Sequence, residues 1–285
     1  MSATTAPRGT TAAPRGTATT PRGTGTAHRA TFVNALHAEW IKFRSLRSTW
    51  YTVAALFVIG PGITWLSASH SRTVYEETTA AGDPWDPTAL SLKSYIMAQL
   101  IIGVLSILVV TSEHATGLIR TSLTAVPSRG RLLAAKVTMV TAVALAAGQV
   151  LMFAVFLLGQ ALLADRHVPN AGLSDDNVLR AVVGGGIYLA AVAVLAVALG
   201  TILRATAGAL ATLVGIVLLV PAFAELLPSW LQEVLDFWPT LGGAAIMAAV
   251  PNPDHPHPWQ NLGGLCLGVV ALLAVAFTVF RRRDV

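Results

Sequence analysis

Long apolar stretches separated by short polar breaks occupy most of the chain from residue 50 onward. A helix that crosses a membrane needs about 20 mostly apolar residues. Six stretches qualify and predict six transmembrane helices: 50–69, 95–112, 137–164, 181–203, 206–227 and 262–280. The third stretch is long enough to tilt or to extend past the membrane. Only Arg204 and its neighbours separate the fourth stretch from the fifth, which predicts a tight helical hairpin.

The segment before the first stretch, residues 31–47, combines apolar and basic positions with a helical period. Its apolar residues recur at spacings of four, four and three, which places them on one face of a helix: Phe32, Leu36, Trp40 and Phe43. Its basic residues lie off that face: Lys42, Arg44 and Arg47. This pattern is typical of an amphipathic helix in the membrane interface, with its apolar side in the lipid. The alternative is a basic lead-in that only anchors the first span.

Residues 228–260, before the last span, contain two shorter apolar patterns. The sequence SWLQEVLDFWP places its apolar residues at helical spacing, and LGGAAIMAAV at 241–250 is too short to cross a membrane. We expect an interfacial helix followed by a short re-entrant helix that dips into the outer leaflet. Irregular backbone at that depth is tolerated where protein or a water-filled cavity receives it. The segment would then cap the external mouth of a pathway, although a folded external loop without a transport role fits the pattern almost as well.

Composition places the chain among integral membrane proteins. Of its 285 residues, 54% are hydrophobic and 12% are charged, whereas soluble domains carry about 25% charged residues. Such a chain has too little polar surface to cover one or two soluble domains. The single cysteine, Cys266, excludes an internal disulfide framework.

The first 30 residues differ in composition from the rest. They carry three copies of a Pro-Arg-Gly-Thr unit at seven-residue intervals, and a proline and a glycine in every unit exclude a continuous helix. We expect residues 1–30 to form a disordered basic tail that is solvated, or whose arginines contact anionic lipid headgroups. Residues 31–285 form the membrane domain in this interpretation.

The basic residues predict the orientation of the spans. With the N-terminus in the cytoplasm, 15 of the 19 Lys and Arg residues fall on the cytoplasmic side, as do only three of the 14 acidic residues. Cytoplasmic loops of membrane proteins carry such an excess of Lys and Arg, so we expect both termini in the cytoplasm. The same distribution excludes nucleic-acid binding, because no basic patch interleaves with aromatic residues as a stacking platform.

The chain lacks a convincing constellation for catalysis or metal binding. No lysine follows a glycine, so a phosphate-binding loop that ends in Gly-Lys is absent. Asp254, His255 and His257 lie among prolines, and such an extended loop does not present ligands as a helical metal site does. We therefore expect no catalytic residue, no metal site and no cofactor bound by this chain. Within the spans, Gln149 and Gln160 are expected to bond across helices.

Small residues within two spans suggest close helix packing. Gly184, Gly185 and Gly186 follow one another in the fourth span, where they allow helices to approach closely. Gly264 and Gly268 form a weaker Gly-xxx-Gly pattern in the sixth span.

The polar segment between the second and third spans, Glu113–Lys136, carries several basic residues. Its first part has an irregular apolar side that predicts a short helix ending at Pro127. Its second part re-enters the membrane with Arg129, Arg131 and Lys136 as anchors. A carboxylate where a span meets the cytoplasm needs solvent or a partner, and we expect Arg120 or Arg129 to pair with Glu113.

Two stretches of the chain resemble the permease subunits of ABC-2 type ATP-binding-cassette transporters. HAEWIKFRSLRSTWY at 37–51 is similar to the Glu-x-x-Lys-x-x-x-x-Arg sequence that precedes the first span of the family. EHATGLIRTSLTAVPSRGRLLAAK at 113–136 is similar to the family's loop between spans two and three. It differs at Gly117-Leu118, where Gly-Thr is more usual. The residues that carry this second match are Glu113, Gly117, Leu123, Pro127, Arg131 and Lys136.

The resemblance implies a bacterial export permease of the cytoplasmic membrane, paired with a second identical or related copy. A separate ATP-binding subunit would bind and hydrolyse ATP. Residues 31–47 would form the elbow helix, through Glu39, Trp40, Lys42, Phe43 and Arg47. Residues 117–127 would form the coupling helix that docks on the ATPase. The coupling residues implied by the match are Glu113, Gly117, Arg120, Thr121, Leu123, Pro127, Arg129, Arg131 and Lys136.

Two other classes of function stay open at the level of sequence. A membrane-embedded transferase would need a carboxylate or histidine pair at one membrane surface, and only residues 254–257 come near. A resistance, immunity or sensory membrane protein would need no transport pathway. The apolar spans carry no charge near their centres, which favours a hydrophobic or amphipathic cargo over a small ion.

Overall fold

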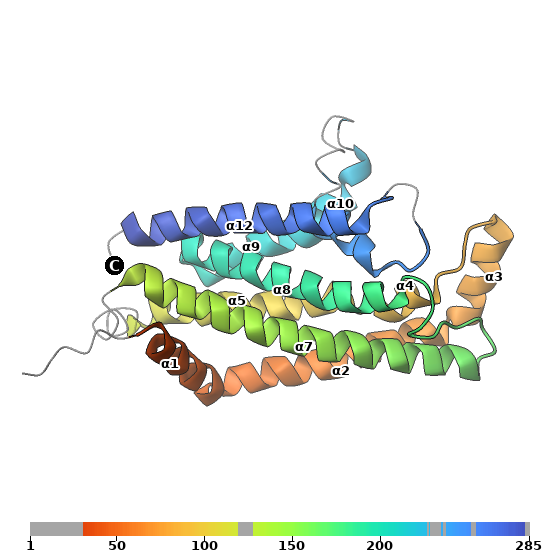
Figure 1. Cartoon of the computed structure of the whole chain (residues 1–285), viewed down its shortest axis with the longest axis horizontal. Helices are drawn as coiled ribbons and strands as arrows, with labels where there is room; N and C mark the ends of the chain where they lie inside the picture. Colours follow the sequence, from red (N-terminus) through yellow and green to blue (C-terminus); the bar gives the residue numbers. More distant parts are fainter. Residues whose placement is uncertain are drawn as a thin grey trace, which may run out of the picture.

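The computed structural model describes residues 31–118, 128–226, 228, 235, 238–251 and 255–282, and the predicted tail at 1–30 lies outside them. All regular structure in these residues is helical, and the long helices run side by side (Figure 1). Five helices are long and apolar enough to cross a membrane, the second of them joined to the short α4 (Pro87–Leu92). They are α2 (Arg47–Ser69), α5 (Tyr95–Ala115), α7 (Arg129–Asp165), α8 (Val178–Leu203) and α12 (Pro258–Arg282). The protein is a polytopic α-helical membrane protein.

The predicted fifth span, 206–227, is shorter than expected. The apolar helix covers Thr206–Ala222, and at about 1.5 Å per residue it measures roughly 25 Å, less than the hydrocarbon core of about 30 Å. It consists of α9 (Thr206–Val214), a π-helical turn η1 (Gly215–Leu219) and α10 (Val220–Ala222), and the 3₁₀ turn η2 (Ala224–Leu226) follows. The hairpin before it is as tight as predicted, because Arg204 and Ala205 alone join α8 to α9.

Pro221 gives the physical reason for this irregular helix. Proline has no N–H, so Pro221 cannot donate to the carbonyl of Val217 in α-helical spacing or to that of Ile216 in π-helical spacing. Both carbonyls accept side chains from the segment before α12 instead. Trp238 Nε1 donates to the Ile216 oxygen at 2.6 Å, and the Thr240 hydroxyl donates to the Val217 oxygen at 2.6 Å.

Helix α8 forms the centre of the bundle. In its most apolar stretch 83% of α8 is buried, against 22% of the corresponding stretches of the outer helices α2 and α12. Helix α8 packs against α7, α5 and α12. The three consecutive glycines of α8 allow this approach, as predicted. A Cβ atom at Gly184 would overlap Ile246, and one at Gly186 would overlap Gln149. The Gly-xxx-Gly pattern of α12 is different, since a Cβ at Gly268 would meet no atom within 4 Å among the described residues.

The predicted interfacial helix is α1 (Phe32–Ser45), which packs mainly against α7. The extended backbone of Leu46 separates it from α2, so Arg47 begins α2 rather than ending α1. The orientation of α1 differs from the prediction that its whole apolar face lies in lipid. Phe43 is buried in the bundle beside Glu39, whereas Trp40 is exposed. The reason is that a helix packed on one neighbour buries positions four apart, here Ala35, Glu39 and Phe43.

The 3₁₀ turn η3 (Gly243–Met247) takes the place of the predicted re-entrant helix. It packs against α8 and α12, with Ile246 and Met247 buried. The predicted interfacial helix before it lies largely outside the described residues. At the same end of the bundle, α3 (Ser71–Ala81) follows α2 after a break at His70 and is more polar than a span.

The two glutamines of α7 bond across helices, as predicted. Gln149 Nε2 donates to the carbonyl of Val183 at 2.8 Å. Gln160 Nε2 donates to the Pro87 oxygen and to the Ser91 hydroxyl at 3.0 Å each, and its Oε1 accepts from the Ala171 N–H at 2.8 Å. Gln149 therefore links α7 to α8, and Gln160 links α7 to α4 and to the loop before α8.

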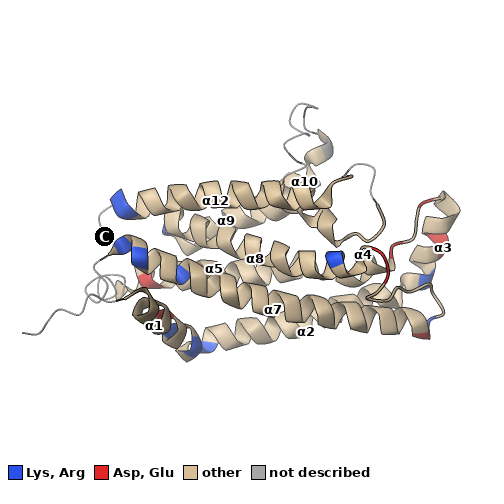
Figure 2. Ribbon diagram, viewed as in Figure 1, with Lys and Arg blue, Asp and Glu red and all other residues tan. Residues whose placement is uncertain are grey.

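Charged residues gather at opposite ends of the bundle (Figure 2). At one end, α1, the start of α7 and the end of α12 carry blue-coloured Lys and Arg residues. At the other end, α3, the stretch before α4 and the end of α7 carry most of the red-coloured Asp and Glu residues. We call these the basic end and the acidic end.

Candidate functional site

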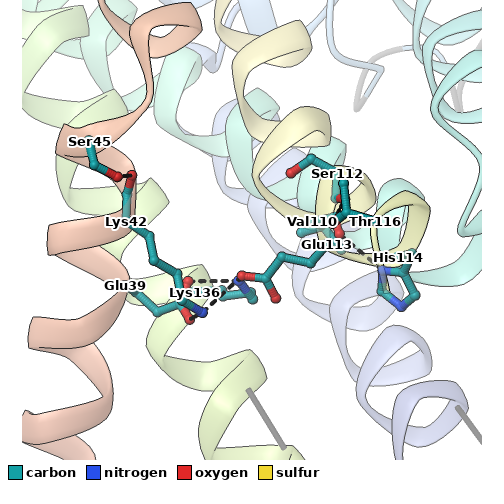
Figure 3. A network of polar contacts seen from close by, with 9 residues as sticks. All are labelled: Glu39, Lys42, Ser45, Val110, Ser112, Glu113, His114, Thr116 and Lys136. Atoms are coloured by element: carbon teal, nitrogen blue, oxygen red, sulfur yellow. Dashed lines mark hydrogen bonds and ion pairs between the residues drawn. The ribbon is translucent and has the colours of Figure 1, made fainter. Parts of the chain in front are cut away.

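Four charged side chains meet at the basic end and form a cluster that we call the charge quartet: Glu39 and Lys42 of α1, Glu113 of α5 and Lys136 of α7 (Figure 3). The Lys136 ammonium lies 2.7 Å from Glu39 Oε2 and 2.7 Å from Glu113 Oε1. The Lys42 ammonium lies 3.0 Å from Glu39 Oε1 and 3.0 Å from Glu113 Oε1. Each cation thus bridges both carboxylates, and the quartet links three helices.

Three members of the quartet are buried, and the fourth is partly exposed. Glu39 and Lys136 are each 2% exposed and Glu113 is 7% exposed, while the Lys42 side chain is 42% exposed. A buried charge is tolerated only with partners, because its desolvation costs several kcal/mol. Lys136 therefore depends on both carboxylates, and both depend on Lys136. Lys42 closes the solvent side of the cluster.

Local sequence explains how these side chains converge. Glu39 lies on the face of α1 that packs against α7, four residues from Phe43. Glu113 lies in the last turn of α5, which ends as Gly117 adopts a left-handed backbone with φ of 72°. Such a residue commonly ends a helix and is usually glycine. Lys136 lies in the second turn of α7, whose start is capped by Ser128 accepting from the Arg131 N–H at 3.3 Å.

The charges around Lys42 change its acidity. Burial alone would lower its pKa, but hydrogen bonds and charge attraction from Glu39 and Glu113 outweigh that effect and raise the pKa above its ordinary value. Lys42 is therefore held in its charged form at neutral pH.

A small apolar cluster packs beside the quartet and connects a fourth helix. Phe280 of α12 is buried among residues of α1 and α7, including Ala35 and Leu132. Its ring meets the His114 ring edge to face, with centroids 6.4 Å apart. Movement of α1 or of the end of α5 therefore disturbs the packing of α12.

A cavity of about 310 Å³ opens beside the quartet, between α1, α5 and α7. Glu39, Lys42 and Glu113 form its charged wall. Both ammonium groups contact Oε1 of Glu113, and the buried Oε2 has no hydrogen-bond partner among the described residues. Figure 3 shows this second oxygen turned away from the two lysines.

The predicted coupling residues fall into two groups. Glu113 and Lys136 lie in the quartet, Gly117 ends α5, and Arg129 and Arg131 lie in the first turn of α7. Arg120, Thr121, Leu123 and Pro127 lie outside the described residues, as does most of the predicted coupling helix.

The partner predicted for Glu113 is tested only in part. We expected Arg120 or Arg129, which are close in sequence. Arg120 lies outside the described residues, and among the described residues Lys42 and Lys136, not Arg129, make the ion pairs of Glu113. The reason is that the bundle brings α1 and α7 to the end of α5, and buried Lys136 needs the carboxylate.

The elbow residues are also divided between two environments. Glu39 and Lys42 belong to the quartet, and Phe43 is buried beneath it. Trp40 is exposed and stacks on Phe43, with ring centroids 6.0 Å apart, and Arg47 begins α2.

The sequence analysis treats Lys136 as a surface anchor and misses its burial. The available signal was a single lysine four residues after Leu132 on a face of α7 that otherwise carries apolar residues.

The loop that holds the acidic and histidine residues before α12 is only partly described. Asp254 lies outside the described residues, and within the described parts of the chain no group of three or more His, Cys, Asp or Glu side chains is arranged to hold a metal ion.

Fold and site together define a multi-pass helical membrane protein in which α1 is ion-paired to the ends of two spans. The chain matches the family described as ABC-2 family transporter protein over residues 35–224, two thirds of its length. It therefore belongs to this family, as its motifs predicted, and is the membrane component of an ABC-2 transporter. Such components are non-catalytic and in general work with an ATPase partner. No curated protein is similar enough in sequence to count as a relative.

Proposed function

We propose that the chain is the permease of an ATP-driven exporter in the cytoplasmic membrane of a bacterium. Two copies, identical or closely related, would pair with two ATP-binding subunits, which alone bind ATP. The shorter helix Thr206–Ala222 would serve as one of six spans. The cargo would be hydrophobic or amphipathic.

The observation that carries the proposal is the position of the charge quartet. Helices α5 and α7 are the two stems that enter and leave the proposed coupling segment, 117–127. The quartet fastens both stems to α1 through buried ion pairs. A push on the coupling segment would therefore move α1, α5 and α7 as one body. Rigid-body movement of this kind is a common way for a partner's closure to rearrange a packed bundle.

The distribution of charge supports the orientation. The ends of α5 and α7 that flank the proposed coupling segment lie at the basic end, together with α1 and the end of α12 (Figure 2). In the proposed orientation this end faces the cytoplasm, consistent with the excess of Lys and Arg in cytoplasmic loops. An ATPase would then meet the permease at the end where the quartet lies.

Helix α12 supports pairing with a second copy. The large apolar side chains that α2 and α12 leave uncovered, including Trp65 of α2 and Leu267 of α12, suit lipid as well as a neighbouring helix. Gly268 of α12 faces open space and would allow a neighbouring helix to approach closely. A seam along α12 between the two copies would place a pathway at the centre of the assembly.

Co-purification tests the proposal. The tagged chain, expressed in its native host and extracted in mild detergent, is expected to carry an ATP-hydrolysing subunit with it. Leu123→Ala and Arg120→Ala are expected to release that subunit. Arg72→Ala at the acidic end is the control and is expected to retain it. A stable, correctly inserted chain that purifies alone under several extraction conditions would contradict the proposal.

A further inference from the structure

An apolar groove lies between α1 and α7. Its volume of about 390 Å³ exceeds the lower limit of ligand pockets, roughly 300 Å³. The groove is separate from the cavity beside the quartet and shares only Met139 with it. Leu36 and Trp40 of α1 form one wall, and the other lining residues belong to α7: Thr138, Met139, Ala142, Val143 and Ala146.

The lining of the groove suits a narrow apolar chain. Thr138, Ala142 and Ala146 are exposed and follow one another at a spacing of four, so their small side chains lie in line along one face of α7. At about 1.5 Å per residue this line is roughly 12 Å long, and one leaflet of the hydrocarbon core measures about 15 Å. Val150 and Leu157 continue the exposed apolar face of α7 beyond the groove. The groove therefore runs along a span for most of the depth of one leaflet.

Arg44 supplies a positive charge beside the groove. It follows Trp40 by one turn on the same face of α1 and is exposed. The Arg44 carbonyl accepts from Trp50 Nε1 at 3.0 Å, so Arg44 lies where the chain enters the span α2. A cation at such a position attracts anionic lipid headgroups.

The ion pairs of the quartet give the depth of Arg44 relative to the groove. Lys42 and Lys136 both contact Glu39, so this part of α1 lies level with Lys136, two residues before the groove begins at Thr138. Glu39 is paired with the two lysines, and within the described part of the chain no carboxylate pairs with Arg44. A charged level followed by an apolar groove matches the order of headgroup and acyl chain in a phospholipid.

We propose that the groove binds one acyl chain of an anionic glycerophospholipid from the leaflet at the basic end, with the lipid phosphate beside Arg44. The chain lies against Leu36, Trp40 and Ala142, where it covers apolar surface of both helices. The inference goes beyond the proposed function, since it concerns binding by the permease alone and requires neither ATPase nor cargo.

Native mass spectrometry of the purified full-length protein in detergent measures this binding. Dioleoylphosphatidylglycerol is the probe, and dioleoylphosphatidylcholine carries the same chains on a headgroup without net charge. We expect the first phosphatidylglycerol to bind at least about fivefold more tightly than the first phosphatidylcholine, since one arginine near an anionic lipid contributes about that factor. Equal affinity for the two lipids would overturn the proposal.

Two tryptophan variants locate the acyl chain. Ala142→Trp fills the groove, and we expect it to weaken phosphatidylglycerol binding at least about tenfold because the chain loses its apolar contacts. Ala154→Trp, at another exposed alanine of α7 outside the groove, is the matched control and should bind as the unmodified protein does. Equal binding by the two variants would overturn the proposal.

Two arginine variants locate the headgroup. Arg44→Gln should weaken phosphatidylglycerol binding about fivefold and leave phosphatidylcholine binding unchanged. Arg282→Gln, at an exposed arginine at the end of α12, is the control and should leave both affinities unchanged. Equal effects of the two arginine variants would show attraction to the basic end as a whole and would overturn the place assigned to the phosphate.

The same spectra distinguish lipid from a second copy of the chain as the occupant. If lipid fills the groove, Ala142→Trp changes the number of lipids retained and leaves the ratio of monomer to dimer unchanged. A lower share of dimer in Ala142→Trp with unchanged phosphatidylglycerol binding would assign the groove to a second copy and overturn the proposal.

Discussion

The two ends of the bundle are held together by different chemistry. At the basic end, Lys136 and Lys42 join α1, α5 and α7 through ion pairs between long side chains. At the acidic end, side chains bond directly to backbone groups. Asp86 Oδ2 accepts from the N–H groups of Ala249 and Val250 at 2.7 and 2.9 Å, and Thr240 donates to the π-helical turn.

This difference indicates what each end holds together. A bond to the backbone fixes a loop at one position, whereas the ion pairs of the quartet join three helices to one another. We therefore expect α1, α5 and α7 to move as one body at the basic end, and the loops to be fixed in place at the acidic end.

The largest expected effect comes from removing the central cation. Lys136→Met leaves Glu39 and Glu113 buried without their shared partner, and breaking a buried pair in this way costs about 3–5 kcal/mol. The unfolding temperature in detergent should fall more than for any single substitution at the acidic end. Lys42→Met, which removes the half-exposed cation, is the control with a smaller expected loss. Equal losses for the two lysine variants would show that burial does not determine the strength of these pairs.

At the acidic end, Asp86→Ala should have the next largest effect. It removes the acceptor for Ala249 and Val250 and the cap of α4, where Oδ1 accepts from the Ala89 N–H at 2.9 Å. We expect a loss of about 2–3 kcal/mol, since three hydrogen bonds to a charged group are removed. Hydrogen exchange of the Ala249 and Val250 amides should rise while exchange near the quartet stays unchanged. Unchanged exchange at both amides would contradict the assignment.

A smaller effect is expected from Thr240→Val. The substitution preserves shape but leaves the Val217 carbonyl without the donor that Pro221 cannot supply, at a cost of about 1 kcal/mol. Thr278→Val, whose hydroxyl donates within α12 at an exposed position, is the control and should be nearly neutral. A larger loss for Thr278→Val than for Thr240→Val would exclude the role assigned to Thr240.

The smallest effect concerns pH. The pKa of Lys42 is raised in the folded protein, so its proton is bound more tightly than in the unfolded chain. The stability it contributes is fully present below the unfolded pKa of about 10.4 and is lost as the pH rises through the higher folded value. The difference in unfolding temperature between the unmodified protein and Lys42→Met should therefore stay constant from pH 7 to 10 and shrink above that. A difference that shrinks below pH 9 would contradict the raised pKa.

The spans and the hairpin at Arg204 could be predicted because each depends on residues that are adjacent in sequence. The shortening of the fifth span follows from Pro221, which is visible in the sequence. The apolar composition of 206–227 nevertheless predicted a full span. The quartet was predicted only in part. The need of Glu113 for a partner follows from its place at the end of a span, whereas the Glu39–Lys136 pair joins residues 97 positions apart. Only the packing of α1 on α7 brings them together, and no local spacing encodes that.

The central claim is that the quartet makes α1 and the stems of the coupling segment move as one body. The direct test is the distance between spin labels at Val33→Cys on α1 and Leu118→Cys beyond α5, two exposed positions, in a Cys266→Ser background. The labelled permease is measured in complex with its ATPase, with and without bound ATP. We predict a narrow distance distribution that ATP leaves unchanged, and a broad one in Lys136→Met. A distance that shifts when ATP binds to the unmodified quartet, or one equally narrow in Lys136→Met, would contradict the claim.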